Sequence, residues 1–194
     1  MELNDLEKID KKSMFKTYDI WPDIARESFE KKNEKLDVKD IIDPYDGKYM
    51  KFESENEAYI YFAEHIGHDN YLKTLKGIVE YTSNKSILIG FSIGATAVWR
   101  VSEDLVNKKI QSAVCFYGSQ IRNFTHISPS FPIELIFPNK EDNFDVLALH
   151  STLNKKNNVS STIVKYLHGF MNFHSINFSE KAYKKQILLM RECL

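Results

Sequence analysis

Short apolar segments alternate with amphipathic ones along the chain, and this alternation restricts the possible folds more than any other feature. The apolar segments are rich in β-branched and aromatic residues, as buried strands are, and they span 38–43, 86–91, 112–118, 133–137 and 161–167, with a weaker candidate at 14–20. Helix-like amphipathic stretches occupy 22–35, 56–82 with a break near Gly67, 96–109, 144–156 and 179–193. The pattern predicts an α/β fold with a mainly parallel sheet of about six strands and helices on both faces.

Length and charge limit the classes of partner. The 194 residues suit a single domain spanning 1–194. Lys and Arg total 26 against 27 Asp and Glu, so no net field favours nucleic acid or an anionic membrane. The composition therefore favours a small, weakly charged molecule as the partner, and it leaves the oligomeric state open.

The sequence also favours one cellular compartment. Residues 1–12 are charged and lack the apolar core of a secretory signal, and the longest apolar run, 87–101, is interrupted by Gly90, Gly94 and Arg100. The two cysteines, Cys115 and Cys193, suit a reducing environment. We therefore expect a soluble cytoplasmic protein without a membrane span.

The segment Gly90-Phe91-Ser92-Ile93-Gly94 joins a predicted strand to a predicted helix. This is the setting of a nucleophile elbow, in which a serine is held in a strained turn at the carboxyl end of a parallel strand. Small residues flank such a serine because the chain packs tightly around it. A turn serine beside a helix start is the alternative interpretation. We favour Ser92 as a nucleophile.

Two later loops carry acids and a histidine. The loop after the strand at 133–137 offers Glu141, Asp142 and Asp145, and the loop after the last strand offers His168. A serine, an acid and a histidine, each following a successive strand, stand in the order of the α/β-hydrolase triad. In such a triad the acid orients the histidine, and the histidine is the general base for the serine. The residues alone leave open which acid would serve.

An acyl-transfer enzyme also needs donors for the negative oxygen of its tetrahedral intermediate. The backbone N–H of Ile93, at the positive end of the following helix, is expected to be one donor. The loop after the first strand should supply the other, and position alone points to the backbone N–H of Ile20.

Other side chains near these loops have competing interpretations. Trp21, Phe91 and Phe170 flank the reactive loops and would wall an apolar substrate pocket, unless they are ordinary core packing. His65 and His68 lack a third ligand set with recognisable spacing. We therefore predict no metal and no cofactor.

From about residue 14 onward, the chain resembles the dienelactone hydrolase family of α/β-hydrolases. The resemblance rests on Asp-Ile-Trp at 19–21, Gly-Phe-Ser-Ile-Gly-Ala at 90–95, Phe-Tyr-Gly at 116–118, Asp-Asn-Phe at 142–144 and His-Gly-Phe at 168–170. It implies the α/β-hydrolase fold, here without room for a cap domain between the late strands. It also favours Asp142 as the third triad member beside Ser92 and His168, with Glu141 as the alternative if the acid loop is one residue out of register.

Two departures from the family shape the functional prediction. Position 92 is serine where the namesake enzymes use cysteine, so a serine hydrolase is expected. Asn172 follows the histidine motif, and no arginine stands there to hold an anionic lactone, which argues against dienelactone as the substrate. We therefore predict a small serine hydrolase that cleaves an ester, thioester or lactone through an acyl-serine intermediate. The alternatives are a non-catalytic binding module on the same fold and a peptidase-like hydrolase.

Overall fold

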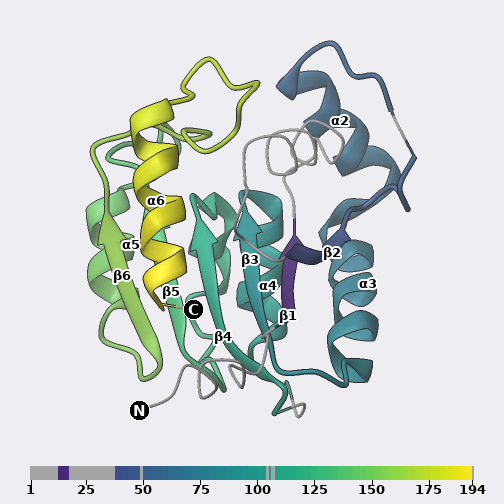
Figure 1. Cartoon of the computed structure of the whole chain (residues 1–194). Coiled ribbons are helices and arrows are strands. Elements are labelled where there is room, and N and C mark those ends of the chain that lie inside the picture. The colour runs from purple at the N-terminus through teal and green to yellow at the C-terminus, as the bar shows by residue number, and fades with distance from the viewer. Residues whose placement is uncertain (1–12, 18–37, 49, 104, 106–107, 194) are drawn as a thin grey trace, which may run out of the picture.

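A parallel sheet forms the centre of the protein (Figure 1). The computed structural model describes residues 13–17, 38–48, 50–103, 105 and 108–193. Within them six strands pair in the order β2-β1-β3-β4-β5-β6, every neighbouring pair being parallel. The strands are β1 (Ser13–Thr17), β2 (Val38–Ile42), β3 (Ser86–Phe91), β4 (Ile110–Phe116), β5 (Ile133–Phe137) and β6 (Val159–Ile163). The helices are α2 (Glu55–His65), α3 (Gly67–Tyr81), α4 (Ile93–Val101), the 3-10 helix η2 (Ser119–Phe124), α5 (Val146–Leu153) and α6 (Glu180–Cys193).

Helices cover both faces of this sheet, as predicted. In Figure 1, α3, α4 and α5 lie behind the strands and α6 lies in front of them. Strand β3 is buried along its whole length, and its side chains alternate between the two faces. Leu88 joins the cluster that contains α3, α4 and α5, whereas Ile87 and Ile89 join the cluster under α6. Burial on both faces is what a parallel sheet between two helical layers requires.

Two strand boundaries differ from the sequence prediction. Strand β4 ends at Phe116 because Tyr117 takes a left-handed backbone conformation with φ 41°, which ends the extended pairing. Strand β6 begins at Val159, which pairs with Ile133 at the start of β5. The predicted strand at 161–167 was therefore placed too late in the chain.

Two helix boundaries also differ. The helix predicted at 96–109 begins at Ile93, directly after the elbow, and ends at Val101. The helix predicted at 144–156 begins at Val146, because the side chain of Asp145 accepts a hydrogen bond from an N–H of its first turn. The helix predicted at 22–35 lies outside the described residues.

Each connection between the late strands β4, β5 and β6 contains one helix. Between β4 and β6 the described chain holds η2 and α5 and no additional cap domain. Over the described ranges, the helices are too short or too polar to cross a bilayer. The carboxyl ends of the strands are thus left to the loops that follow them.

The turn from β3 into α4 leaves no space for a side chain at Gly90. A Cβ atom placed there would lie 2.6 Å from the Cα of Ala95 and 2.7 Å from its backbone N. Both neighbours are backbone atoms, so relief would require the start of α4 to move. Close approach of the helix to the strand therefore explains the glycine.

Replacing Gly90 by alanine should destabilise the protein because the new methyl group meets backbone. For Gly90→Ala we expect the free energy of unfolding, measured by urea denaturation, to fall by about 1–3 kcal/mol. Gly77→Ala is the matched control, because Gly77 lies within α3 and a Cβ there meets nothing within 4 Å. That control should gain about 0.5–1 kcal/mol from helix propensity. Equal effects of the two substitutions would contradict the packing argument.

Candidate active site

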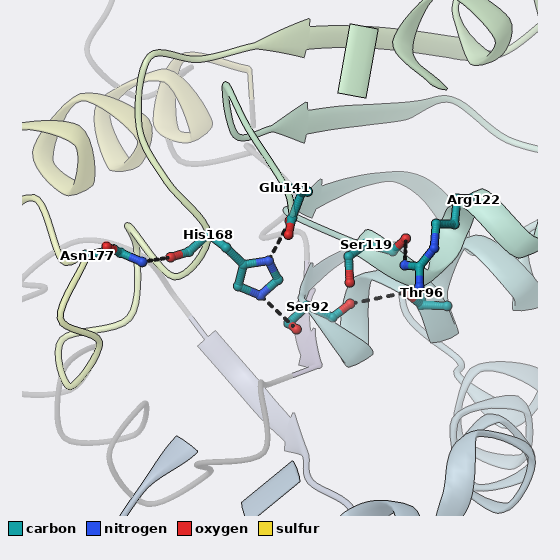
Figure 2. Close-up of polar contacts among 7 residues, drawn as sticks. All are labelled: Ser92, Thr96, Ser119, Arg122, Glu141, His168 and Asn177. Carbon is teal, nitrogen blue, oxygen red and sulfur yellow. Dashed lines mark hydrogen bonds and ion pairs between the residues drawn. The ribbon is translucent and has the colours of Figure 1, made fainter. Parts of the chain in front are cut away.

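Ser92 occupies a strained turn between β3 and α4. Its backbone angles are φ 46° and ψ −110°, a conformation that side-chain-bearing residues rarely adopt. Its N–H donates to the carbonyl oxygen of Phe116 at 2.9 Å, and its carbonyl accepts from the N–H of Thr96 at 3.1 Å. These bonds fix the turn to β4 on one side and to α4 on the other. The turn presents the Ser92 hydroxyl toward the histidine loop (Figure 2).

His168, in the loop after β6, lies between a serine and a carboxylate. Figure 2 shows its imidazole pointing toward Ser92 and Glu141, with contacts at both ring nitrogens. Nε2 lies 3.2 Å from Oγ of Ser92, and Nδ1 lies 2.7 Å from Oε1 of Glu141. The first distance is at the long end for a hydrogen bond, as is common before substrate binds. The structure thus joins the three groups in the order hydroxyl, imidazole, carboxylate.

The backbone and the ring of His168 are each held by neighbours. Its carbonyl oxygen accepts a hydrogen bond from Nδ2 of Asn177 at 2.9 Å. Gly169 follows with φ 82°, and a Cβ atom there would clash with the side chain of Ser175. The buried ring of Tyr117 lies 4.8 Å from the imidazole, measured between centroids. The imidazole is therefore positioned in two ways: Asn177 holds the backbone of His168, and the Tyr117 ring packs against the imidazole ring.

The structure corrects the acid that the sequence favoured. Glu141, the alternative, contacts His168, and its side chain is only 14% exposed. Asp142 points into solvent with 87% of its side chain exposed, and its Oδ1 pairs with Nζ of Lys140 at 3.0 Å. An ion pair this exposed contributes little to stability. Asp142 is thus a surface residue, and the acid loop is one residue out of register with the resemblance.

Backbone contacts of the acid loop explain this register. The N–H of Asn139 donates to the carbonyl oxygen of Tyr166 at 2.9 Å, which ties the exit of β5 to the exit of β6. The tie brings Glu141 beside the histidine loop. Asp145, the third acid left open by the sequence, is used elsewhere, because its Oδ1 accepts from the N–H of Ala148 at 3.0 Å and caps α5.

Ile93, the predicted donor to a negative oxygen, lies at the start of a helix. It is the first residue of α4, directly after Ser92, and the N–H groups of a first helical turn have no acceptor within the helix. The positive end of the helix dipole lies at the same point. Ile20, predicted as the second donor, lies outside the described residues, as does Trp21.

The aromatic residues predicted to wall a pocket belong to the core instead. Phe91 is 3% exposed and Phe170 is fully buried. Phe91 stacks on Phe116 with ring centroids 5.0 Å apart, and Phe170 packs edge-on against the same ring. We therefore correct the prediction: Phe91 and Phe170 are core residues and not walls of a substrate pocket.

His65 and His68, the histidines considered as metal ligands, lie against aromatic rings. The His65 ring packs on Tyr61, and burial lowers the pKa of His68. A hydrogen bond from Arg100 holds the pKa of Asp69 below its usual range. Among the described residues, no group of three or more His, Cys, Asp or Glu side chains is close enough to hold a metal ion.

Sequence reasoning missed the residues that support His168. Asn177 lies nine positions after the histidine, and nothing in its local pattern marks it as a partner of that backbone. Tyr117 belongs to the Phe-Tyr-Gly segment, whose glycine indicates a turn in the sequence. The structure shows that Tyr117 has a left-handed backbone conformation in this turn. Its contact with the imidazole depends on the fold and could not be read from the segment.

Comparisons with known proteins identify the family and the fold. The sequence pattern of the Dienelactone hydrolase family matches residues 22–194. The chain is also 32% identical over 140 residues to the "Uncharacterized protein YczH" of Bacillus subtilis (strain 168), which covers 71% of this chain and 68% of that protein.

Solved structures share the fold at low sequence identity. A protein described as "Putative Dienelactone Hydrolase" from Klebsiella pneumoniae subsp. pneumoniae MGH 78578 superimposes with a TM-score of 0.71 at 13% identity, covering 94% of this chain and 87% of that one. The thermophilic esterase Est2 of Thermogutta terrifontis, with propionate bound, gives a TM-score of 0.55 at 12% identity, covering 94% and 82%. Both likenesses concern the α/β-hydrolase fold.

The contact between Glu141 and His168 predicts a nuclear magnetic resonance signature. A proton on Nδ1 that is shared with a carboxylate at 2.7 Å should resonate far downfield in the proton spectrum. Glu141→Gln should remove or strongly shift this resonance, because the amide is a weaker acceptor. Asp142→Asn is the matched control and should leave it in place. Loss of the signal in the Asp142 variant alone would contradict the assignment of the acid.

Proposed function

The chain belongs to the dienelactone hydrolase family, and we propose that it is a serine hydrolase that cleaves a small ester, thioester or lactone. The proposal rests on the series of contacts from Ser92 through His168 to Glu141. These groups come from three separate strand-exit loops, as a triad on this fold requires. An accidental surface cluster would not also include a strained serine beside a helix start.

The proposed reaction has two halves with the same proton carrier. In acylation, Oγ of Ser92 bonds to the substrate carbonyl carbon while its proton passes to Nε2 of His168. The tetrahedral intermediate then collapses, the bond to the leaving group breaks, and the imidazolium returns the proton to that group. In deacylation, a water gives its proton to Nε2 and attacks the acyl carbon. The bond between the acyl carbon and Oγ of Ser92 then breaks, the imidazolium returns its proton to Oγ, and the acid product leaves.

Glu141 supports both halves without exchanging protons with the substrate. Its carboxylate accepts from Nδ1 of His168, so that the unprotonated Nε2 faces Ser92 as the base. The carboxylate also stabilises the imidazolium that forms at each step. Because the Glu141 side chain is largely shielded from water, this attraction is stronger than it would be on an open surface.

The negative oxygen of each tetrahedral intermediate needs fixed donors. We assign one donor to the backbone N–H of Ile93, at the start of α4. The second donor, predicted at Ile20, remains a prediction. Loss of one such donor typically slows the chemical step by a factor of about 10²–10³, so the two positions would carry a large share of catalysis.

We expect a small molecule with an acyl group of modest size as the substrate. In the described part of the chain, no cap domain lies over the carboxyl edge of the sheet. The esterase Est2 was solved with propionate, a short carboxylate of the kind that the proposed deacylation releases. A peptide substrate remains an alternative that a panel of esters, thioesters, lactones and amides would separate.

The described chain contains a second serine–histidine contact that serves as an internal control. Oγ of Ser161 lies 2.7 Å from Nδ1 of His150, between β6 and α5. No carboxylate pairs with His150 within the described ranges. Ser161 is also nearly buried, and its backbone has ordinary strand conformation. Among the described residues, it therefore lacks both an activating acid and the strained turn of Ser92.

A fluorophosphonate probe tests the proposal directly. The probe should label the purified protein at Ser92, with loss of fluoride, and Ser92→Ala should abolish labelling and reduce hydrolysis of p-nitrophenyl acetate to a small residual rate. Ser161→Ala should retain both. Mass spectrometry of the digested adduct identifies the modified residue. Unlabelled wild-type protein would favour the binding-module alternative, and a label at Ser161 would overturn the assignment of the nucleophile.

A further inference from the structure

A groove lies at the opposite edge of the sheet from Ser92. It has a volume of about 460 Å³ and opens at the amino ends of β4, β5 and β6, beside the last turns of α6. We call it the amino-edge groove. The side chains that matter for its chemistry are Ser112, Val114, Pro132, Glu134, Ser160 and Met190.

Strand register places one carboxyl group between neutral neighbours. Glu134 on β5 is aligned with Val114 on β4 and with Ser160 on β6, so the three side chains share one face of the sheet. Ser112 lies two residues before Val114 and therefore on the same face. Directly opposed neighbours are about 4.8 Å apart and diagonal ones about 7–8 Å, so both hydroxyl groups lie within reach of a ligand held by Glu134.

Within the described residues, the Glu134 carboxyl group has no compensating charge. Among the described residues, none of the ion pairs includes it, and the groove is lined by no Lys or Arg. The side chain is half-buried, and this burial raises its pKa above the usual value for a glutamate. A position so placed on a covered sheet face is ordinarily apolar, as Ile136 is two residues later.

We propose that the amino-edge groove binds a primary ammonium group attached to a short apolar chain. The ammonium carries one positive charge and three N–H donors. Glu134 supplies the opposite charge, and the hydroxyls of Ser112 and Ser160 supply further acceptors. The apolar chain of the ligand would then contact Val114, Pro132 and Met190.

The same features argue against other ligands. A single carboxylate with neutral hydroxyls offers too few oxygen ligands and too little charge for a dedicated divalent cation site. An anion would be repelled by the Glu134 carboxylate, and no Lys or Arg lines the groove to attract it. A wholly apolar ligand would bury the carboxyl group without a hydrogen bond, which costs free energy. A small organic cation is the class that satisfies charge, donors and apolar contact together.

Titration of isotope-labelled full-length protein with n-butylammonium chloride tests this inference by nuclear magnetic resonance. We expect saturable shifts of amide signals at the amino ends of β4, β5 and β6 and of the Met190 methyl signal. n-Butanol, which has the same chain without the charge, should bind at least tenfold more weakly. Glu134→Gln should weaken butylammonium binding by the same factor, because it removes the charge and keeps the shape.

Two further variants separate this site from general charge effects and from the proposed hydrolysis. Glu64→Gln removes one exposed carboxylate from α2 and should bind butylammonium as the wild type does. Ser92→Ala should also bind normally, because Ser92 follows the carboxyl end of β3. Thermal unfolding confirms that each variant is folded. Unsaturable shifts, equal affinity for butanol, or unchanged affinity in Glu134→Gln would each overturn the inference, whatever the fate of the hydrolase proposal.

Discussion

The close approach of α4 to β3 is the constraint on which the rest of the site depends. Helix α4 can begin directly after Ser92 only because Gly90 presents no side chain to Ala95. That contact forces Ser92 into a conformation that is unfavourable in isolation, and its hydrogen bond to the carbonyl of Phe116 holds it there. The same turn presents the hydroxyl to the histidine and places the N–H of Ile93 beside it. One packing contact thus fixes both the proposed nucleophile and a donor for the negative oxygen.

The parallel sheet separates two kinds of chemistry. At its carboxyl edge, three loops bring the His168 imidazole between the hydroxyl of Ser92 and the carboxylate of Glu141 (Figure 2). At its amino edge, Glu134 is half-buried and no basic residue of the described chain pairs with it. The three groups of the first arrangement come from one chain. The second is completed, in our proposal, by a cation from outside.

The fold and two of the three contacting groups were predictable because they depend on local pattern. Alternating apolar and amphipathic segments predict the parallel sheet, and small residues around Ser92 predict a tight strand-to-helix turn. The acid was not predictable in the same way, because Glu141 and Asp142 are adjacent and a shift of one residue exchanges a contacting side chain for a solvated one. Contacts between the exits of β5 and β6, such as the hydrogen bond from Asn139 to Tyr166, place the acid loop, and no local pattern predicts them. For the same reason, apolar Phe91 could be placed near the site by sequence but not assigned to the core.

The central claim is that Ser92, His168 and Glu141 act as one unit, and a double-mutant cycle tests it most directly. The rate of p-nitrophenyl acetate hydrolysis would be measured for wild type, Ser92→Ala, Glu141→Gln and the double variant. Because the acid acts only through the imidazole that serves the serine, the double variant should be no slower than Ser92→Ala alone. Additive losses, with Glu141→Gln slowing the Ser92→Ala protein as much as it slows the wild type, would contradict the account.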